Sequence, residues 1–278
     1  MRRFAQVDVF GTRAGTGNPL AVVLDADGLT TDEMAAFARW TMLSETTFLL
    51  PPTDSTADYR VRIFTTTEEL PFAGHPTLGS AHAWLAGGGV PRDPERLVQE
   101  CGAGLVEVRR DADTLSFKAP PITQGGPLDD RTLDRALTCL RIGREAVVAH
   151  AWGVNGPRWA MIQLADVEAV RALRPDSSAL DDFLLGVVGL CPAEAQHAYE
   201  VRAFCPPPPS EDPVTGSLNA AVADWLQGRG LAPASYVVRQ GMQAGSDGTV
   251  HVRRAPDGLW IGGAVADVIT GQVAWPAG

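Results

Sequence analysis

The feature that most constrains this chain is one stretch that occurs twice, about half a chain apart. Residues 62–85 contain Glu-Leu-Pro-Phe-Ala-Gly-His-Pro-Thr-Leu-Gly-Ser, and residues 202–222 contain Glu-Asp-Pro-Val-Thr-Gly-Ser-Leu-Asn-Ala-Ala. Laying His75 on Asp212, an offset of 137 positions, also pairs Pro76 with Pro213, Gly79 with Gly216, Ser80 with Ser217 and Ala83 with Ala220. Because solenoid repeats recur every ~20–50 residues, this wider spacing predicts two duplicated halves.

Each copy is predicted to be a strand that leads into a buried helix. Pro76 and Pro213 suit the first helical position, which puts His75 and Asp212 at the helix N-caps. The residues that follow are small and apolar on nearly every side, which is typical of a helix buried all round. Buried helix starts carry unpaired N–H groups and partial positive charge, which suit a carboxylate. The sequence therefore predicts two helix starts that share one cleft; the alternative is two core helices whose small residues only allow close packing.

Composition narrows the class of protein and of partner. The chain has 278 residues, 45% of them hydrophobic and 20% charged, so it has room for two domains with a buried core. A net charge of −10 argues against nucleic acid or an anionic membrane as partner, although a locally positive site for a small anionic substrate is still possible. No apolar run approaches the ~18–20 residues of a membrane span, and the first residues lead into a strand rather than a signal peptide. We expect a cytoplasmic protein.

Metal and dinucleotide sites are not indicated. The four cysteines, Cys101, Cys139, Cys191 and Cys205, show no CxxC spacing, which argues against zinc and against a disulfide framework. A GxGxxG fingerprint stops at Gly15-Thr-Gly17, because a proline follows where a helix would begin. We therefore expect free thiols, no metal and no bound cofactor.

The boundary between the halves is expected in the turn-rich residues 124–127. This gives a first domain, residues 1–125, carrying Glu45 and His75, and a second, residues 126–278, carrying Asp212, with the last strand free to pack back on the first half. Asn-Gly-Pro before the strand at 159–163 repeats Gly-Asn-Pro before the strand at 20–24. In the second half we also predict a helix at 178–185, a strand at 198–204 and a loop at the prolines 206–209.

Glu45 is expected in a short bend between a helix and the apolar strand at 47–50. Most glutamates in such places are solvated loop carboxylates. The alternative is a general acid/base held beside apolar walls, where desolvation raises its pKa toward neutrality. Local sequence alone leaves both interpretations open.

Several motifs together resemble the signature of the phenazine biosynthesis PhzF-like isomerase family. They are Asp-Val-Phe at 8–10, Gly-Asn-Pro-Leu-Ala-Val-Val-Leu at 17–24, Leu-Ser-Glu-Thr-Thr-Phe at 43–48, the Glu-Leu-Pro-Phe-Ala-Gly-His-Pro-Thr-Leu-Gly run at 69–79, Asn-Gly-Pro at 155–157, Glu-Asp-Pro-Val-Thr-Gly-Ser at 211–217 and Arg-Gln-Gly at 239–241. The resemblance runs nearly end to end. It implies a diaminopimelate epimerase-like α+β fold, in which two pseudo-symmetric halves each wrap a curved, mostly antiparallel sheet around a central helix.

The resemblance also implies a reaction and a set of site residues. It implies cofactor-independent proton transfer, with Glu45 as the acid/base and with His75 and Asp212 as polar contacts to the substrate. Hydrogen bonds to the substrate are implied for Ser44, Gly74, Gly216, Ser217 and Asn18. In the phenazine enzyme itself the reaction isomerises trans-2,3-dihydro-3-hydroxyanthranilate, and the family suggests a homodimer. Leu218-Asn219, the four prolines before Glu211 and Ser246 depart from the family pattern and leave the substrate open.

Two rival functions are considered beside this isomerase. A cysteine-pair amino-acid epimerase or racemase shares the implied fold but needs a thiol on each side of the substrate carbon. The glycine-rich turns of this chain, Ala-Gly-His at 73–75 and Glu-Asp-Pro at 211–213, contain no cysteine. A non-catalytic small-molecule-binding protein would keep the helix starts and tolerate loss of Glu45, which this chain retains.

Overall fold

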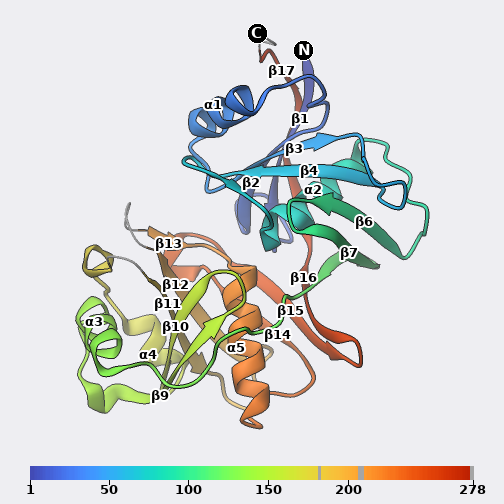
Figure 1. The fold of residues 1–278 in the computed structure, drawn as a ribbon. Helices are drawn as coiled ribbons and strands as arrows, with labels where there is room; N and C mark the ends of the chain where they lie inside the picture. Colours follow the sequence, from blue (N-terminus) through green and yellow to red (C-terminus); the bar gives the residue numbers. More distant parts are fainter. Residues whose placement is uncertain (181–182, 206–209, 276–278) are drawn as a thin grey trace. The chain divides into compact units, whose positions relative to one another are not determined.

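The computed structural model describes residues 1–180, 183–205 and 210–275. The chain forms two compact units, Met1–Lys118 with Gly262–Gly278, and Ala119–Ile261. The chain thus changes unit where β8 (Thr114–Lys118) ends, a few residues before the turn at 124–127 that the sequence suggests. The last strand, β17 (Val265–Val273), belongs to the first unit, where it pairs antiparallel with β1 (Arg2–Val9), and the two strands lie side by side in Figure 1.

The first unit is a mixed sheet built from β1 to β8. Antiparallel pairs are β1–β2, β3–β4, β4–β5, β6–β7 and β7–β8, whereas β2–β3 and β4–β6 are parallel. Besides β1 and β8, the strands of this sheet are β2 (Asn18–Val23), β3 (Thr46–Leu50), β4 (Tyr59–Phe64), β5 (Glu69–Leu70), β6 (Arg96–Cys101) and β7 (Gly104–Asp111).

The second unit repeats this topology in the same order. The antiparallel pairs β9–β10, β11–β12, β12–β13 and β14–β15 correspond to β1–β2, β3–β4, β4–β5 and β6–β7, and the parallel pairs β10–β11 and β12–β14 correspond to β2–β3 and β4–β6. Its strands are β9 (Val147–Val154), β10 (Arg158–Leu164), β11 (Leu184–Leu190), β12 (Tyr199–Cys205), β13 (Ser210–Asp212), β14 (Ser235–Gln240), β15 (Gly248–Ala255) and β16 (Gly258–Gly263). The predicted duplication and the mostly antiparallel α+β class are therefore confirmed.

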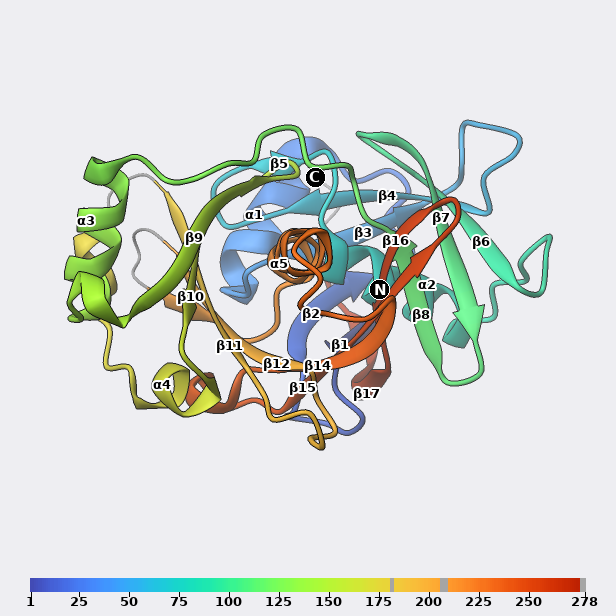
Figure 2. The same ribbon diagram turned by 90° about the horizontal axis from the view of Figure 1, so that it is seen from below.

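One central helix belongs to each unit. The helix α2 (Gly74–Ala86) packs against β1, β2, β3 and β8, and α5 (Gly216–Gly228) packs against β9, β10 and β15. Figure 2 looks along α5 and shows the strands of its unit curving around it. Both helices are buried on several sides, as their small apolar residues predict.

The remaining helices lie on the outer faces and bury one side only. They are α1 (Thr31–Thr41), α3 (Asp130–Leu140) and α4 (Val167–Ala172), with short 3₁₀ turns at Arg144–Ala146, Ser177–Ala179 and Met242–Ala244. In α1 the buried face is formed by Met34, Phe37 and Ala38, and the Phe37 ring meets the Phe48 ring edge-on at 6.1 Å. Among the described helices none is long and apolar enough to cross a membrane.

The structure corrects the way the two copies are aligned. In the first unit Phe64 pairs with Glu69 across β4–β5, and in the second Phe204 pairs with Glu211 across β12–β13. The central helices then begin at Gly74 and Gly216. Both Glu69 to Glu211 and Gly74 to Gly216 give an offset of 142 positions, so the predicted offset of 137 is wrong. The offset of 137 matched glycines and serines inside the helices. It missed the spacing between glutamate and helix start, which is the same in the two units.

The predicted N-caps are also wrong, for the same reason. The N-cap residues are Ala73 and Thr215, so His75 is the second residue of α2, while Asp212 ends β13. Asp212 pairs with Ala203 in the ladder, which keeps its backbone extended, and Pro213 lies outside the helix. The residue of α5 that aligns with His75 is therefore Ser217, the second residue of the helix.

A third correction concerns the helix predicted at 178–185, because the described residues of this stretch are not α-helical. Residues 178 and 179 lie in the 3₁₀ turn Ser177–Ala179, and residues 184 and 185 begin β11, which is buried on both faces. A strand buried on both faces is a continuous apolar run, which periodicity does not distinguish from a buried helix. The predicted proline loop at 206–209 lies outside the described residues.

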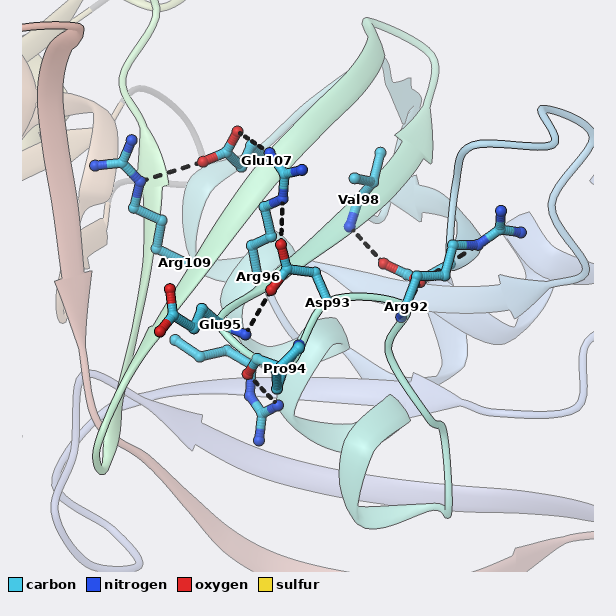
Figure 3. Close-up of polar contacts among 10 residues, drawn as sticks. Arg92, Asp93, Pro94, Glu95, Arg96, Val98, Glu107 and Arg109 are labelled. Atoms are coloured by element: carbon cyan, nitrogen blue, oxygen red, sulfur yellow. Dashed lines mark hydrogen bonds and ion pairs between the residues drawn. The ribbon is translucent and has the colours of Figure 1, made fainter.

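Charged side chains hold the segment before β6 against β7 in the first unit. In Figure 3, Arg96 Nε lies 2.9 Å from Asp93 Oδ2 and its Nη1 lies 3.7 Å from Glu107 Oε2. Glu107 is also 3.2 Å from Arg109. These pairs are solvent-exposed, and exposed pairs contribute only ~0–1 kcal/mol each. They order a surface segment rather than hold the fold.

Candidate active site

Glu45 follows the bend after α1 and immediately precedes β3. The next residue, Thr46, is buried and its hydroxyl lies 2.8 Å from that of Thr41, which ties the end of α1 to the start of β3. The Glu45 side chain is 17% exposed, so it is not the solvated loop carboxylate of the first interpretation. It is held on a rigid turn with part of its carboxylate accessible.

His75 meets Glu45 from the first turn of α2. Its Nε2 lies 3.4 Å from Glu45 Oε2, longer than an ordinary N–H···O bond. Burial lowers the pKa of His75 to about 3. Although the distance alone would allow an ion pair, we take the imidazole as neutral at pH 7, because burial penalises its charged form. His75 is thus a neutral polar neighbour of the Glu45 carboxylate.

The start of α2 differs from the starts of the outer helices. No side chain caps α2, and its first turn holds no acidic residue. By contrast, α1, α3 and α4 are capped by the side chains of Thr30, Asp129 and Asp166, respectively. Gly74 opens the helix against the Phe117 ring, where an added Cβ would come within 2.7 Å of the ring. First-turn amides have no intrahelical partner, so an anion is favoured there.

The other predicted residues of the first unit differ in accessibility. Asn18 is the first residue of β2 and is buried, opposite Val9 in the β1–β2 ladder. Ser44 lies in the same bend as Glu45 and is exposed. Within this unit the structure therefore brings together Glu45 and His75.

In the second unit, Asp212 belongs to a dense hydrogen-bond network at the start of α5. The Thr215 hydroxyl donates to Asp212 Oδ2 at 2.5 Å. Gln240, at the end of β14, donates through Nε2 to the Asp212 carbonyl at 3.1 Å and to Thr215 Oγ1 at 2.9 Å. Its Oε1 accepts from the Thr215 amide at 3.0 Å and from Asn219 Nδ2 at 2.8 Å.

Gly216 and Ser217 follow at the first two positions of α5. The Ser217 hydroxyl accepts from Trp159 Nε1 at 3.1 Å, and the Ser217 carbonyl accepts from Asn155 Nδ2 at 2.8 Å. These bonds fix the first turn of α5 on β10 and on the turn that precedes it. As in α2, no side chain caps the helix and its first turn has no acidic residue.

Sequence reasoning missed Thr215, Gln240 and Asn219. All three stood within or next to quoted motifs, Glu-Asp-Pro-Val-Thr-Gly-Ser and Arg-Gln-Gly, but the incorrect N-cap assignment drew attention to Asp212 alone. A usable signal was the pair of polar residues four apart, Thr215 and Asn219, at the start of an otherwise apolar helix.

The cysteines lie away from both helix starts in sequence. The two N-cap positions are Ala73 and Thr215, whereas Cys101 ends β6 and donates weakly to the Gly104 carbonyl at 3.5 Å. Burial raises the pKa of Cys101 and raises that of Cys139 to about 11. All four cysteines are free thiols, as predicted.

Comparisons with known proteins identify the family of the chain and support its fold. The sequence profile of the family described as "Phenazine biosynthesis-like protein" matches residues 7–266. The chain is 36% identical over 289 residues to Antisense-enhancing sequence 1 of Schizosaccharomyces pombe, covering 97% of each chain. It is 34% identical over 259 residues to trans-2,3-dihydro-3-hydroxyanthranilate isomerase of Pseudomonas fluorescens, covering 88% of this chain and 87% of that one. The crystal structure of a Bacillus anthracis phenazine biosynthesis protein of the PhzF family superposes with a TM-score of 0.85 at 21% identity, covering 98% of both chains, which supports the same fold.

Proposed function

Because this chain belongs to the family of phenazine biosynthesis-like proteins and is an isomerase of that family, we propose that it catalyses a cofactor-independent proton transfer on a small carboxylate-bearing substrate. Glu45 acts as the acid/base. His75 and Asp212 are polar contacts to the substrate. The substrate class follows from the anion-favouring start of α2 and from the reaction named for the Pseudomonas fluorescens relative.

The observation that carries the proposal is the pairing of Glu45 with a neutral His75 at 3.4 Å. An efficient general acid/base has a pKa near the working pH. Since the pKa of His75 lies near 3, its imidazole is a poor proton carrier at neutral pH, and the transfer falls to Glu45. A neutral imidazole can still donate a hydrogen bond that orients the carboxylate or the substrate.

The epimerase alternative receives no support at the helix starts. A cysteine-pair mechanism needs a thiolate and a thiol flanking one carbon. The caps of α2 and α5 are Ala73 and Thr215, and the raised pKa of Cys101 keeps that thiol protonated at neutral pH. The homodimer stays a prediction.

The test is Glu45→Gln, which keeps size and hydrogen bonding but removes the titrating group. General acid/base groups contribute about 10²–10⁴-fold, so we expect turnover to fall by about that factor with little loss of substrate binding. Turnover is followed with trans-2,3-dihydro-3-hydroxyanthranilate as the first probe, and binding by calorimetry. The matched control is Glu68→Gln, in an exposed turn of the same unit. Near-normal turnover in Glu45→Gln would remove Glu45 from its role.

A further inference from the structure

Gln240 is one of the most completely hydrogen-bonded side chains in the described part of the second unit. Its carboxamide is 2% exposed, and both of its N–H donors and both lone pairs of its oxygen are engaged. Nothing in the reaction proposed above requires a glutamine on β14. Burial of a fully bonded carboxamide beside a site carboxylate therefore needs its own explanation.

The orientation of the Gln240 carboxamide is dictated by the backbone. The Thr215 amide can only donate, so the oxygen Oε1 must face it, and the Asp212 carbonyl can only accept, so the nitrogen Nε2 must face that side. The remaining N–H of Gln240 then points at Thr215 Oγ1, 2.9 Å away. The hydroxyl oxygen of Thr215 is thus an acceptor in this bond.

The hydroxyl proton of Thr215 has a defined direction as a result. With its oxygen accepting from Gln240, the hydroxyl donates its own proton to Asp212 Oδ2 at 2.5 Å. A short O–H···O⁻ bond of this kind is charge-assisted and strong. The carboxylate of Asp212 is thereby held at one rotamer by a hydroxyl that is itself held by Gln240.

The backbone around this network leaves no room for it to shift. Gly241, directly after Gln240, has φ of +104°, and an added Cβ would lie 2.6 Å from the Pro213 carbonyl oxygen. The end of β14 therefore lies close against the turn that joins Asp212 to α5. Asn219 closes the network from within the helix by bonding both Gln240 Oε1 and the Thr215 carbonyl.

We propose that Gln240 is a positioning residue of the active site, which acts through the Thr215 hydroxyl to fix the Asp212 carboxylate for substrate binding. This assignment rests on the proposed function, because it takes Asp212 as a substrate contact. The first unit has Cys101 on β6 at the ladder position that Gln240 holds on β14, and its buried glutamine on β6, Gln99, bonds Tyr59 and Thr77 instead. The link to a site carboxylate is specific to Gln240.

The variants are Gln240→Met and Thr215→Val, which remove the polar atoms at nearly constant volume. Misplacing a contact group by about 1 Å costs up to ~100-fold, so we expect kcat/KM for trans-2,3-dihydro-3-hydroxyanthranilate to fall about 10- to 100-fold. Because Asp212 binds substrate and does not carry the proton, most of this fall is a rise in KM. Thr215→Ser retains the hydroxyl and restores most of the lost binding.

The matched control is Gln163→Met in the same unit. Gln163 is also a buried glutamine, 4% exposed, but it accepts from Arg229 at the opposite end of α5. We expect it to lower the melting temperature by less than Gln240→Met does, because it removes one hydrogen bond instead of four, and to leave KM unchanged. If Gln240→Met lowers the melting temperature but, like Gln163→Met, leaves KM unchanged, Gln240 is only structural. Should Gln240→Met not fold, Thr215→Val against Thr215→Ser decides the same question.

A second measurement does not depend on turnover. The ¹³Cγ resonance of Asp212 in the ligand-free protein should move in Gln240→Met and Thr215→Val and stay in place in Gln163→Met; an unmoved resonance in the first two overturns the assignment. Failure of the proposed function is distinguishable, because it shows as retained turnover in Glu45→Gln. Loss of turnover there, together with normal KM in Gln240→Met, refutes the positioning role alone.

Discussion

The strand–helix junctions of the two units share a scaffold and differ in the chemistry placed on it. Arg62 pairs with Glu69 at 2.6 Å and lies 5.1 Å from the Phe64 ring centre, while Arg202 pairs with Glu211 at 2.7 Å and lies 5.0 Å from the Phe204 ring centre. Each junction then enters a helix without a side-chain cap. The duplication has kept the parts that set backbone geometry.

The candidate functional side chains come from different places in the two junctions. In the first, a neutral imidazole lies on the helix itself and the carboxylate arrives from the start of β3. In the second, the carboxylate of Asp212 ends the strand and is bonded by the cap residue Thr215. Duplicated scaffolds therefore do not imply duplicated roles, and each half has to be interpreted from its own contacts.

Each junction contains the same kind of ion pair, but the two pairs differ in burial. The comparison can therefore be tested on the free energy of unfolding. The side chains of Arg62 and Glu69 are 25% and 38% exposed, against 6% and 16% for Arg202 and Glu211. Removing one partner of a buried pair costs ~3–5 kcal/mol because the other charge is left uncompensated. Arg202 would keep its bonds to the Val170 and Leu173 carbonyls, which places Glu211→Ala near the lower end.

We expect Glu211→Ala to lower the free energy of unfolding by about 3 kcal/mol and Glu69→Ala by less than about 1 kcal/mol, both from urea titrations. The double variant Arg202→Met/Glu211→Leu should recover part of the loss, because replacing both charges by apolar groups is often neutral. Equal losses in the two single variants would mean that burial does not distinguish the copies.

A smaller effect is the pH dependence of stability that His75 gives to the first junction. The pKa of His75 is lowered to about 3 in the folded protein from 6.5 in the unfolded chain. Below pH 6.5 the unfolded state therefore binds a proton that the folded state does not, and stability falls as pH falls. At about 1.4 kcal/mol per pH unit, proton binding by His75 in the unfolded chain lowers the free energy of unfolding by about 2 kcal/mol between pH 6.5 and 5.

The stability of a His75→Gln variant should lack this part of the pH dependence. Urea unfolding of both proteins at pH 5, 6 and 7 measures it, and the difference between their free energies of unfolding should narrow by about 2 kcal/mol on going from pH 7 to 5. A constant gap would show that His75 is not held neutral.

The sequence predicted the repeated elements and missed the hydrogen bonds that join distant residues within one unit. Small apolar residues predicted α2 and α5, and motif matches singled out Glu45, His75 and Asp212 as candidate site residues, because these are local signals. The bonds from Gln240 to Thr215 span 25 positions, and no local pattern reports them. The helix expected at 178–185 failed for a related reason, since only the neighbouring strands on both sides of β11 show that its apolar run is a strand.

The smallest expected effect tests whether thiols take part in the reaction. Neither cap residue, Ala73 in one junction or Thr215 in the other, is a cysteine. A cysteine-pair epimerase needs thiols that ionise readily, yet burial raises the pKa of Cys101, Cys139 and Cys191. A variant with all four cysteines replaced, by alanine at the buried Cys139 and serine elsewhere, should keep most of its turnover if it folds. Cys101 ends β6 at the ladder position that Gln240 holds on β14, two residues after the partner of Tyr59 or Tyr199, so it is the informative single change. Turnover that disappears in a folded Cys101→Ser protein would assign the proton transfer to a thiol of the first unit.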